Sequence, residues 1–320
     1  MWNPKDPNAL ASASLTGLSV GDAFGEQFFD TANWGSVPFP GRQWEEPDYS
    51  SGDLTERFLA ADLTPKGPWP WTDDTQMACT VVEQLRFGGG IDPDRLAGAW
   101  AERVELKRDY GPSVLAILDA VRQARPWRPV AAAAFDGAGS LGNGSAMRIA
   151  PLGAWFSDDL THAVAQARLA SEVTHASPDG IAGGIAVAVA AAVSARRGTA
   201  SRDELLETVI ARTPEGEVRA GLRAVAGIGW EAAATGVASE VGNGHRTLVT
   251  DTVPFCVWAA FRHLDDYQLA IRTTVSVGGD IDTNCAIVGG IVASGAGFNT
   301  VPQAWIAARE PLPDWVGTER

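Results

Sequence analysis

Residues 277–297 read VGGDIDTNCAIVGGIVASGAG, and this stretch decides the fold. The acidic cluster Asp280-Ile281-Asp282-Thr283 comes early in it, and nearly every residue that follows is apolar or small. A helix without a polar face has to be covered on all sides, so residues 284–296 are predicted to form a helix at the centre of the protein. Gly289 and Gly290 would let neighbouring backbones approach closely, despite the cost of glycine to helix stability.

A second stretch of the same kind, residues 181–195, predicts another central helix. Elsewhere, apolar residues recur mostly at helical spacing, as in Met77, Val81 and Leu85. Helices are predicted near residues 11–23, 75–87, 94–107, 112–124, 143–155, 160–174, 178–196, 203–212, 216–233, 252–263, 267–276, 283–296 and 302–309. The sequence has no internal repeat that would indicate a solenoid. It therefore predicts an all-α protein, with a single compact multi-helix domain over residues 1–320.

Residues 30–70 differ from the rest of the chain. They are rich in proline, glycine, tryptophan and acidic residues, and their apolar residues show little periodicity. Such a segment is typical of a long loop, and long loops in compact domains tend to be lids or binding loops. We therefore expect a lid-like loop near residues 30–70.

The composition limits the partners of the protein. Its 320 residues carry a formal net charge of −14, and binding to nucleic acid or to an anionic membrane needs basic surfaces, so neither partner is expected. The longest apolar run, near residues 180–194, is short for a membrane span and rich in small residues. Three cysteines lie far apart in apolar stretches, which predicts buried thiols. Residues 1–8 have no basic segment typical of a secretory signal, so a cytoplasmic location is expected.

Two similar acidic clusters are the strongest sign of chemistry. Thr72-Asp73-Asp74-Thr75 and Asp280-Ile281-Asp282-Thr283 each stand directly before a strongly apolar helix. Helix capping explains either cluster alone, since Asp and Thr are favoured N-caps and acidic first turns complement the helix dipole. Capping needs only one side chain per helix, however, and excess buried carboxylates need a cation. The two clusters together supply only oxygen ligands, which favours two magnesium or manganese ions over zinc.

A glycine-rich loop, GSLGNG at residues 139–144, is predicted to run into a helix. Free backbone N–H groups at such a junction bind anions, although most glycine-rich loops are ordinary turns. A phosphate-bearing substrate would use both this loop and a metal site. His175 follows a predicted helix, where a lone histidine is more often a capping or packing residue than a ligand. The sequence contains no Ser-His-Asp, Cys-His or zinc-binding pattern, so attack by water assisted by a metal is the simplest chemistry.

Four blocks of the sequence together resemble the ADP-ribosylglycohydrolase family. They are GLSVGDAFGE at 17–26, WTDDTQMA at 71–78, GSLGNGSAMRIAPLG at 139–153 and VGGDIDTNCAIVGGIVASGAG at 277–297. The blocks span nearly the whole chain, and the order of the last three is quite specific. The resemblance implies an all-helical domain with two divalent cations, Mg or Mn, at the floor of a cleft. It also implies that the protein binds ADP-ribose and acts on an ADP-ribosylated protein or small conjugate.

The same resemblance implies a role for each matching residue. The metal ligands would be Thr72, Asp73, Asp74, Asp280, Asp282 and Thr283. The loop residues Gly139, Ser140, Leu141, Gly142, Asn143 and Gly144 would wrap the diphosphate and ribose of ADP-ribose, and His175 would contact a phosphate. The metals would hold the ribose diol and lower the pKa of the water that attacks the anomeric carbon. Asp73 or Asp74 would orient or deprotonate that water.

One position departs from the family pattern. Many members place a glutamate four residues after the glycine of their GDA-x-G block, where this chain has Phe29. Either the nearest acid, Glu26, takes over the gating and acid/base role, or the protein acts on another linkage, or it only binds. Phe28, Phe29 and the tryptophans Trp34 or Trp44 would stack on adenine or shape the acceptor side, although core or surface packing explains each of them equally well.

The leading interpretation is therefore a metal-dependent hydrolase that cleaves the N- or O-glycosidic bond between ADP-ribose and its acceptor. The alternative is a non-catalytic descendant of the same fold that binds ADP-ribose or has a structural role. A binding protein would be free to lose its acidic residues, so the complete acidic set favours catalysis. A two-metal phosphohydrolase would use similar ligands, but it would leave the glycine-rich block unexplained.

Overall fold

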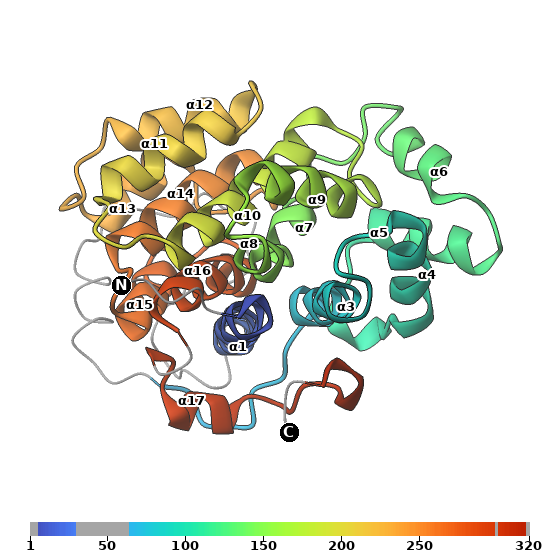
Figure 1. The fold of residues 1–320 in the computed structure, drawn as a ribbon, viewed down its shortest axis with the longest axis horizontal. Helices are drawn as coiled ribbons and strands as arrows, with labels where there is room; N and C mark the ends of the chain where they lie inside the picture. Colours follow the sequence, from blue (N-terminus) through green and yellow to red (C-terminus); the bar gives the residue numbers. More distant parts are fainter. Residues whose placement is uncertain (1–5, 30–63, 298–299, 318–320) are drawn as a thin grey trace.

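The computed structural model describes residues 6–29, 64–297 and 300–317. Within these ranges the regular elements are all helices, and the only β-type pairings are two isolated bridges, Trp69 with Arg309 and Gly142 with Leu248. The predicted all-α fold is therefore confirmed (Figure 1). Most of the predicted lid-like loop, including Trp34 and Trp44, lies outside the described residues.

The helices follow one another along the chain as α1 (Pro7–Glu26), α3 (Asp73–Gly88), α4 (Pro93–Arg103), η2 (Leu106–Arg108), α5 (Pro112–Arg122), α6 (Trp127–Ala133), α7 (Gly144–Met147), α8 (Ala150–Trp155), α9 (Leu160–Glu172), α10 (Pro178–Ala195), α11 (Arg202–Arg212), α12 (Glu217–Ala226), α13 (Ala234–Val241), α14 (Val249–Arg262), α15 (Tyr267–Val275), α16 (Ile281–Ala296), α17 (Gln303–Ala308) and η4 (Asp314–Val316).

Helices α1 and α16 form the central pair of the fold, and α3 lies beside α1 (Figure 1). The two central helices touch backbone to backbone along a stripe of glycines spaced four residues apart on α1. A Cβ atom at Gly17 would stand 2.3 Å from the carbonyl oxygen of Gly289, and one at Gly21 would stand 2.1 Å from that of Cys285. Neither position has room for a side chain. The glycines therefore set the spacing of α1 and α16, and with it the spacing of the polar residues near their ends.

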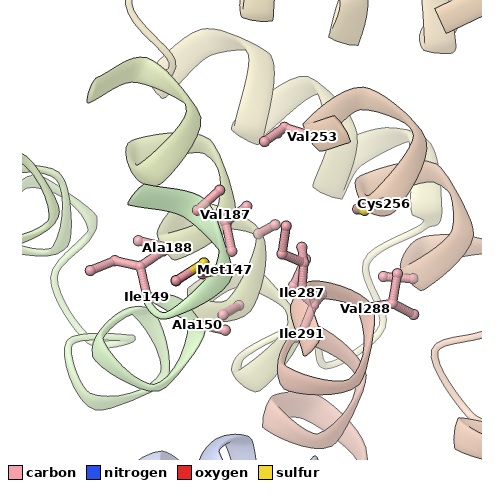
Figure 2. Packing of buried hydrophobic residues seen from close by; sticks show 14 of the residues in the cluster. Met147, Ile149, Ala150, Val187, Ala188, Val253, Cys256, Ile287, Val288 and Ile291 are labelled. Atoms are coloured by element: carbon pink, nitrogen blue, oxygen red, sulfur yellow. The ribbon is translucent and has the colours of Figure 1, made fainter. Parts of the chain in front are cut away.

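Helix α10 is a second buried helix in the core of the protein. It is long and apolar enough to cross a membrane, but 89% of its apolar window is buried inside the protein, as expected for a core helix. Figure 2 shows apolar side chains from the region of α7 and α8, from α10, from α14 and from α16 meeting in this core. Gly153 of α8 lies so close to α10 that a Cβ atom there would stand 1.9 Å from the carbonyl oxygen of Ala188.

The predicted helix over 143–155 was wrong in one respect, because the chain forms two short helices there, α7 and α8. Pro151 stands in the first turn of α8, and its ring lacks the N–H that a continuous helix would use to bond the carbonyl oxygen of Met147. The predicted helix over 216–233 also ends early, at Ala226, where Gly227 and Gly229 follow. Helices α6 and α13 were not predicted.

The C-terminal segment holds the chain that leads into α3. The backbone N–H of Trp69 donates to Ala308 O at 2.7 Å, and that of Glu310 donates to Trp69 O at 2.8 Å. Arg108 donates to Trp71 O at 2.8 Å, and its guanidinium also makes a two-pronged ion pair with Glu310 at 2.7 and 2.8 Å. These contacts fix the position of the residues directly before Thr72.

Candidate metal centre and adjoining loop

Three buried carboxylates from three different helices meet at one point. Asp22 comes from α1, Asp74 from the first turn of α3 and Asp282 from the first turn of α16, and one oxygen of each lies within 4.8 Å of the others. The close approach of α1 and α16 brings the first and third together: a Cβ atom at Gly25 would stand 2.8 Å from the Cα of Asp282. The structure therefore joins the two acidic clusters that the sequence singled out.

For Asp22 the sequence left open a structural role and a supporting role beside the metal ligands. Its carboxylate accepts hydrogen bonds from the backbone N–H groups of Thr72 and Thr75, at 3.0 and 3.2 Å. It also accepts from both hydroxyl groups, at 2.9 Å from Thr72 and 2.5 Å from Thr75. Asp22 therefore anchors the N-terminus of α3 to α1. The sequence signal for this role was an acidic residue surrounded by the small and apolar residues of GLSVGDAFGE, because such a residue is buried and needs hydrogen-bond partners.

Helix capping and site formation coexist at α3. Thr72 is its N-cap, and its hydroxyl accepts from the backbone N–H of Asp74 at 3.3 Å. The hydroxyl of Thr283 donates to the two carboxylate oxygens of Asp74, at 3.3 and 3.2 Å. Asp280, in contrast, is the N-cap of α16 and makes no side-chain capping hydrogen bond. Helix capping by a side chain thus accounts for Thr72, and it does not account for the carboxylate of Asp280.

Burial and mutual repulsion dominate the electrostatics of this acidic cluster. Burial raises the pKa of Asp22 from 3.8 to about 7, although the hydrogen bonds from the two threonines oppose this shift. The pKa values of Asp73 and Asp74 are raised well above 3.8, first by burial and then by neighbouring carboxylates, including Asp282. A divalent cation would remove this repulsion, and the donors are all oxygens. The residues present therefore fit a hard cation such as magnesium or manganese.

The glycine-rich loop lies directly beside this centre. The side-chain amide of Asn143 donates to Asp280 Oδ2 at 2.7 Å and to the hydroxyl of Thr252 at 3.2 Å. Asn143 therefore connects the loop to a carboxylate of the second acidic cluster. The loop and the acidic centre are therefore direct neighbours in the fold.

The loop is held by its own hydrogen bonds. The N–H of Gly142 donates to the hydroxyl oxygen of Ser140 at 3.1 Å, and that of Asn143 donates to Thr247 O at 3.0 Å. Leu141 O accepts from the N–H of Val249 at 3.0 Å. Two of the amides expected to be free for an anion are therefore engaged within the protein. Residues 247–249, which sequence reasoning did not single out, are the partner of the loop.

His175 lies behind the loop, with only 1% of its surface exposed. Cβ atoms at Gly142 and Gly144 would stand 3.5 and 3.2 Å from atoms of its imidazole ring, so the ring packs against both glycines. Burial, and after it the positive charge of Arg148, lower the pKa of His175 from 6.5 to about 3. The ring is therefore neutral at ordinary pH, and it supports the loop from within.

At the end of α1, the two phenylalanines pack in the core, whereas Glu26 lies on the same face of the helix as Asp22. Phe28 is buried and its ring centre lies 5.3 Å from that of Phe24, so for Phe28 the packing interpretation is confirmed. Phe29 is partly buried and packs against the same core. Glu26 is half-buried at the last residue of α1, one helical turn beyond Asp22. This spacing puts Glu26 and Asp22 on the same face of α1.

An all-α fold that brings two acidic clusters and a glycine-rich loop together defines a class of protein. The sequence pattern of ADP-ribosylglycohydrolases matches residues 4–318, which is nearly the whole chain. The chain belongs to the ADP-ribosylglycohydrolase family.

Individual relatives cover most of the chain. It is 28% identical to human ADP-ribosylhydrolase ARH3 over 330 residues, covering 91% of this chain and 86% of the human protein. It is 27% identical over 297 residues to an uncharacterized protein of Archaeoglobus fulgidus, covering 91% of this chain and 88% of that protein. Among solved structures, a chain from an ADP-ribosylglycohydrolase-related protein complex matches with a TM-score of 0.65 and 21% identity, covering 98% and 96% of the two chains. This last likeness supports the fold.

Proposed function

We propose that the protein is a metal-dependent hydrolase that cleaves the glycosidic bond between ADP-ribose and an acceptor, either a protein side chain or a small conjugate. The observation that carries this proposal is the meeting of buried Asp22, Asp74 and Asp282 beside the glycine-rich loop, with Asn143 joining the loop to Asp280. Membership of the ADP-ribosylglycohydrolase family and the likeness to ADP-ribosylhydrolase ARH3 support an activity on ADP-ribose.

The metal ligands in this proposal are Thr72, Asp73, Asp74, Asp280, Asp282 and Thr283. Their number and their oxygen donors suit two divalent cations, magnesium or manganese. Bound cations would supply a Lewis acid that holds ribose hydroxyl groups and makes water more acidic. Asp22 would keep the first cluster in place through its bonds to Thr72 and Thr75.

The proton of the attacking water would go to a carboxylate at the rim of the site. Asp73 is half-buried, whereas Asp74 is buried, so we favour Asp73 as the group that orients or deprotonates water. Glu26, at the end of α1, would serve as the second acid where many family members have a glutamate and this chain has Phe29. Carboxylates on both sides would offset positive charge developing at the anomeric carbon.

The ligand-binding part of the proposal is the loop Gly139 to Gly144 with His175. The loop would contact the diphosphate and the ribose next to it. His175 would keep the loop in position for phosphate binding, because its ring packs against Gly142 and Gly144.

The test is the release of free ADP-ribose from arginine-linked, serine-linked and O-acetyl conjugates, with Mg²⁺ or Mn²⁺ and with EDTA. Asp282→Asn keeps the shape of a buried residue of the acidic centre while removing its charge, and Asp119→Asn makes the same change at an exposed site on α5. We expect metal-dependent release that is lost with EDTA and in Asp282→Asn but kept in Asp119→Asn.

Each outcome separates the proposal from its alternatives. Release from only one conjugate would identify the linkage. Binding of ADP-ribose without release from any conjugate would overturn the catalytic proposal in favour of a binding protein. Release that is insensitive to EDTA would overturn the metal-dependent mechanism.

A further inference from the structure

Arg148 is a fully buried cation that the proposed mechanism does not use. It lies between α7 and α8 with 0% of its surface exposed. Its guanidinium stacks over the Trp100 ring at 4.2 Å and approaches the sulfur of Met77, on α3, at 3.4 Å. Burying a guanidinium is costly, and the described residues give its Nε no hydrogen-bond partner. Such a group needs a reason beyond packing.

Arg148 keeps its positive charge although it is buried. Burial lowers its pKa from 12.5 to about 9, and Asp73, Tyr110 and Asp74 act in the opposite direction. Arg148 is therefore protonated at neutral pH. A protonated guanidinium has hydrogen-bond donors only, which fixes the direction of every bond it makes.

One of these bonds leads to the glycine-rich loop. Arg148 Nη2 lies 2.6 Å from the hydroxyl oxygen of Thr174, and that oxygen lies 2.7 Å from Nδ1 of His175. Because Arg148 can only donate, Thr174 accepts from it, and this leaves the hydroxyl hydrogen of Thr174 able to donate to Nδ1. A neutral imidazole that accepts at Nδ1 carries its hydrogen on Nε2. The ring in turn packs against Gly142 and Gly144.

We propose that Arg148 is a positioning residue that fixes the tautomer and orientation of His175 through Thr174, and so holds the glycine-rich loop in its ligand-binding form. The chain of contacts runs from α3, through Arg148, Thr174 and His175, to Gly142. This proposal rests on the proposed function only in naming ADP-ribose as the ligand of the loop. The positioning of the ring and loop is a property of the protein alone.

The test compares Thr174→Val, which removes the hydroxyl and keeps the shape, with Thr174→Ser, which restores the hydroxyl. Thr274→Val is the matched control, since Thr274 is also fully buried but its hydroxyl donates only to Ala270 O, one helical turn back. Arg148→Lys keeps the positive charge and loses the planar guanidinium group with its fixed hydrogen-bond donors. Three quantities are measured without metal and with diamagnetic Mg²⁺: the ¹⁵N shifts of the His175 ring, hydrogen exchange of residues 139–147, and the Kd for ADP-ribose.

In the wild type, Thr174→Ser and Thr274→Val, we expect the His175 ring to carry its hydrogen on Nε2 and the loop to exchange slowly. In Thr174→Val and Arg148→Lys we expect a changed tautomer signal, faster exchange and at least tenfold weaker ADP-ribose binding, with Mg²⁺ affinity unchanged in Thr174→Val.

An unchanged ring signal and unchanged exchange in Thr174→Val would overturn the proposal, whatever happens to Arg148→Lys. If neither the wild type nor any of the variants binds ADP-ribose, the proposed function fails. The ¹⁵N shifts of the His175 ring and the hydrogen exchange of the loop still decide whether Arg148 positions His175.

Discussion

Asp22 on α1 accepts the hydroxyl hydrogen of Thr75 on α3 at 2.5 Å, and this contact ties the first acidic cluster to the central helix pair. The same carboxylate accepts three further hydrogen bonds from Thr72 and Thr75. Its oxygens are therefore largely committed to holding α3. At the same time Asp22 lies within reach of Asp74 and Asp282. We conclude that Asp22 organises the centre and adds to its negative charge.

We predict that Asp22→Asn weakens Mn²⁺ binding by about 10–100-fold, the usual cost of removing a residue that orients metal ligands. An asparagine amide would turn hydrogen-bond donors toward Thr72 and Thr75, which are donors themselves. Isothermal titration with Mn²⁺ measures the affinity. Asp119→Asn, an exposed change on α5, is the control and should bind as the wild type does. Equal affinities for the two variants would show that Asp22 does not organise the site.

The stabilisation of the protein by Mn²⁺ is predicted to grow as the pH rises from 5 to 8. The pKa of Asp22 is raised to about 7 in the folded protein from 3.8, so the metal-free fold keeps a proton that the unfolded chain loses. Its contribution to stability is present below pH 3.8 and is lost as the pH rises through about 7. Asp73 and Asp74 act in the same direction. Metal binding needs the ionised carboxylates and displaces these protons.

The measurement is the difference in melting temperature between Mn²⁺ and EDTA samples at each pH. We expect the difference to increase with pH in the wild type and to be absent in Asp282→Asn. A difference that is constant from pH 5 to 8 would contradict the proton displacement.

Acidification is predicted to destabilise the wild type relative to His175→Gln. The pKa of His175 is lowered to about 3 in the folded protein, so below pH 6.5 the unfolded chain takes up a proton that the folded ring refuses. This contribution to stability is present above pH 6.5 and is lost as the pH falls toward 3, by at most about 1.4 kcal/mol per pH unit. Urea unfolding of both proteins at pH 7, 6 and 5 measures the change. A constant difference between them would mean that the ring is not buried as a neutral group.

The sequence was sufficient for the all-α fold and for the two acidic clusters, because helical periodicity and helix N-terminal residues are local signals. It also predicted α16 as a central helix from its lack of a polar face. The break between α7 and α8 was missed because the glycine-rich block was taken to run straight into one helix, and Pro151 was given too little weight.

The roles of Asp22, Arg148 and Thr174 were out of reach for a different reason. Each depends on a partner distant in the sequence, as Asp22 depends on Thr72 and Thr75, which lie 50 and 53 residues away. A single buried acid or arginine in a sequence has no local pattern that reveals its partner. The packing of the His175 ring against Gly142 and Gly144 was out of reach in the same way, and contact of His175 with a phosphate stays a prediction.

The spacing of α1 and α16 gives the last prediction. A Cβ atom at Gly21 would stand 2.1 Å from the carbonyl oxygen of Cys285, a backbone atom that cannot move aside without moving α16. We expect Gly21→Ala to destabilise the protein by about 1–3 kcal/mol or more, the usual cost of overpacking a core. It should also lower Mn²⁺ affinity, because Asp22 and Asp282 would move apart with the two helices.

Gly98 on α4 is the matched control, since a Cβ atom there would meet nothing within 4 Å. Alanine at this helical position reduces the entropy of the unfolded chain, so Gly98→Ala should stabilise the protein by about 0.5–1 kcal/mol and leave Mn²⁺ affinity unchanged. Urea unfolding and Mn²⁺ titration of the two variants measure both effects. If Gly21→Ala binds Mn²⁺ as tightly as Gly98→Ala, the contact between α1 and α16 does not set the geometry of the acidic centre.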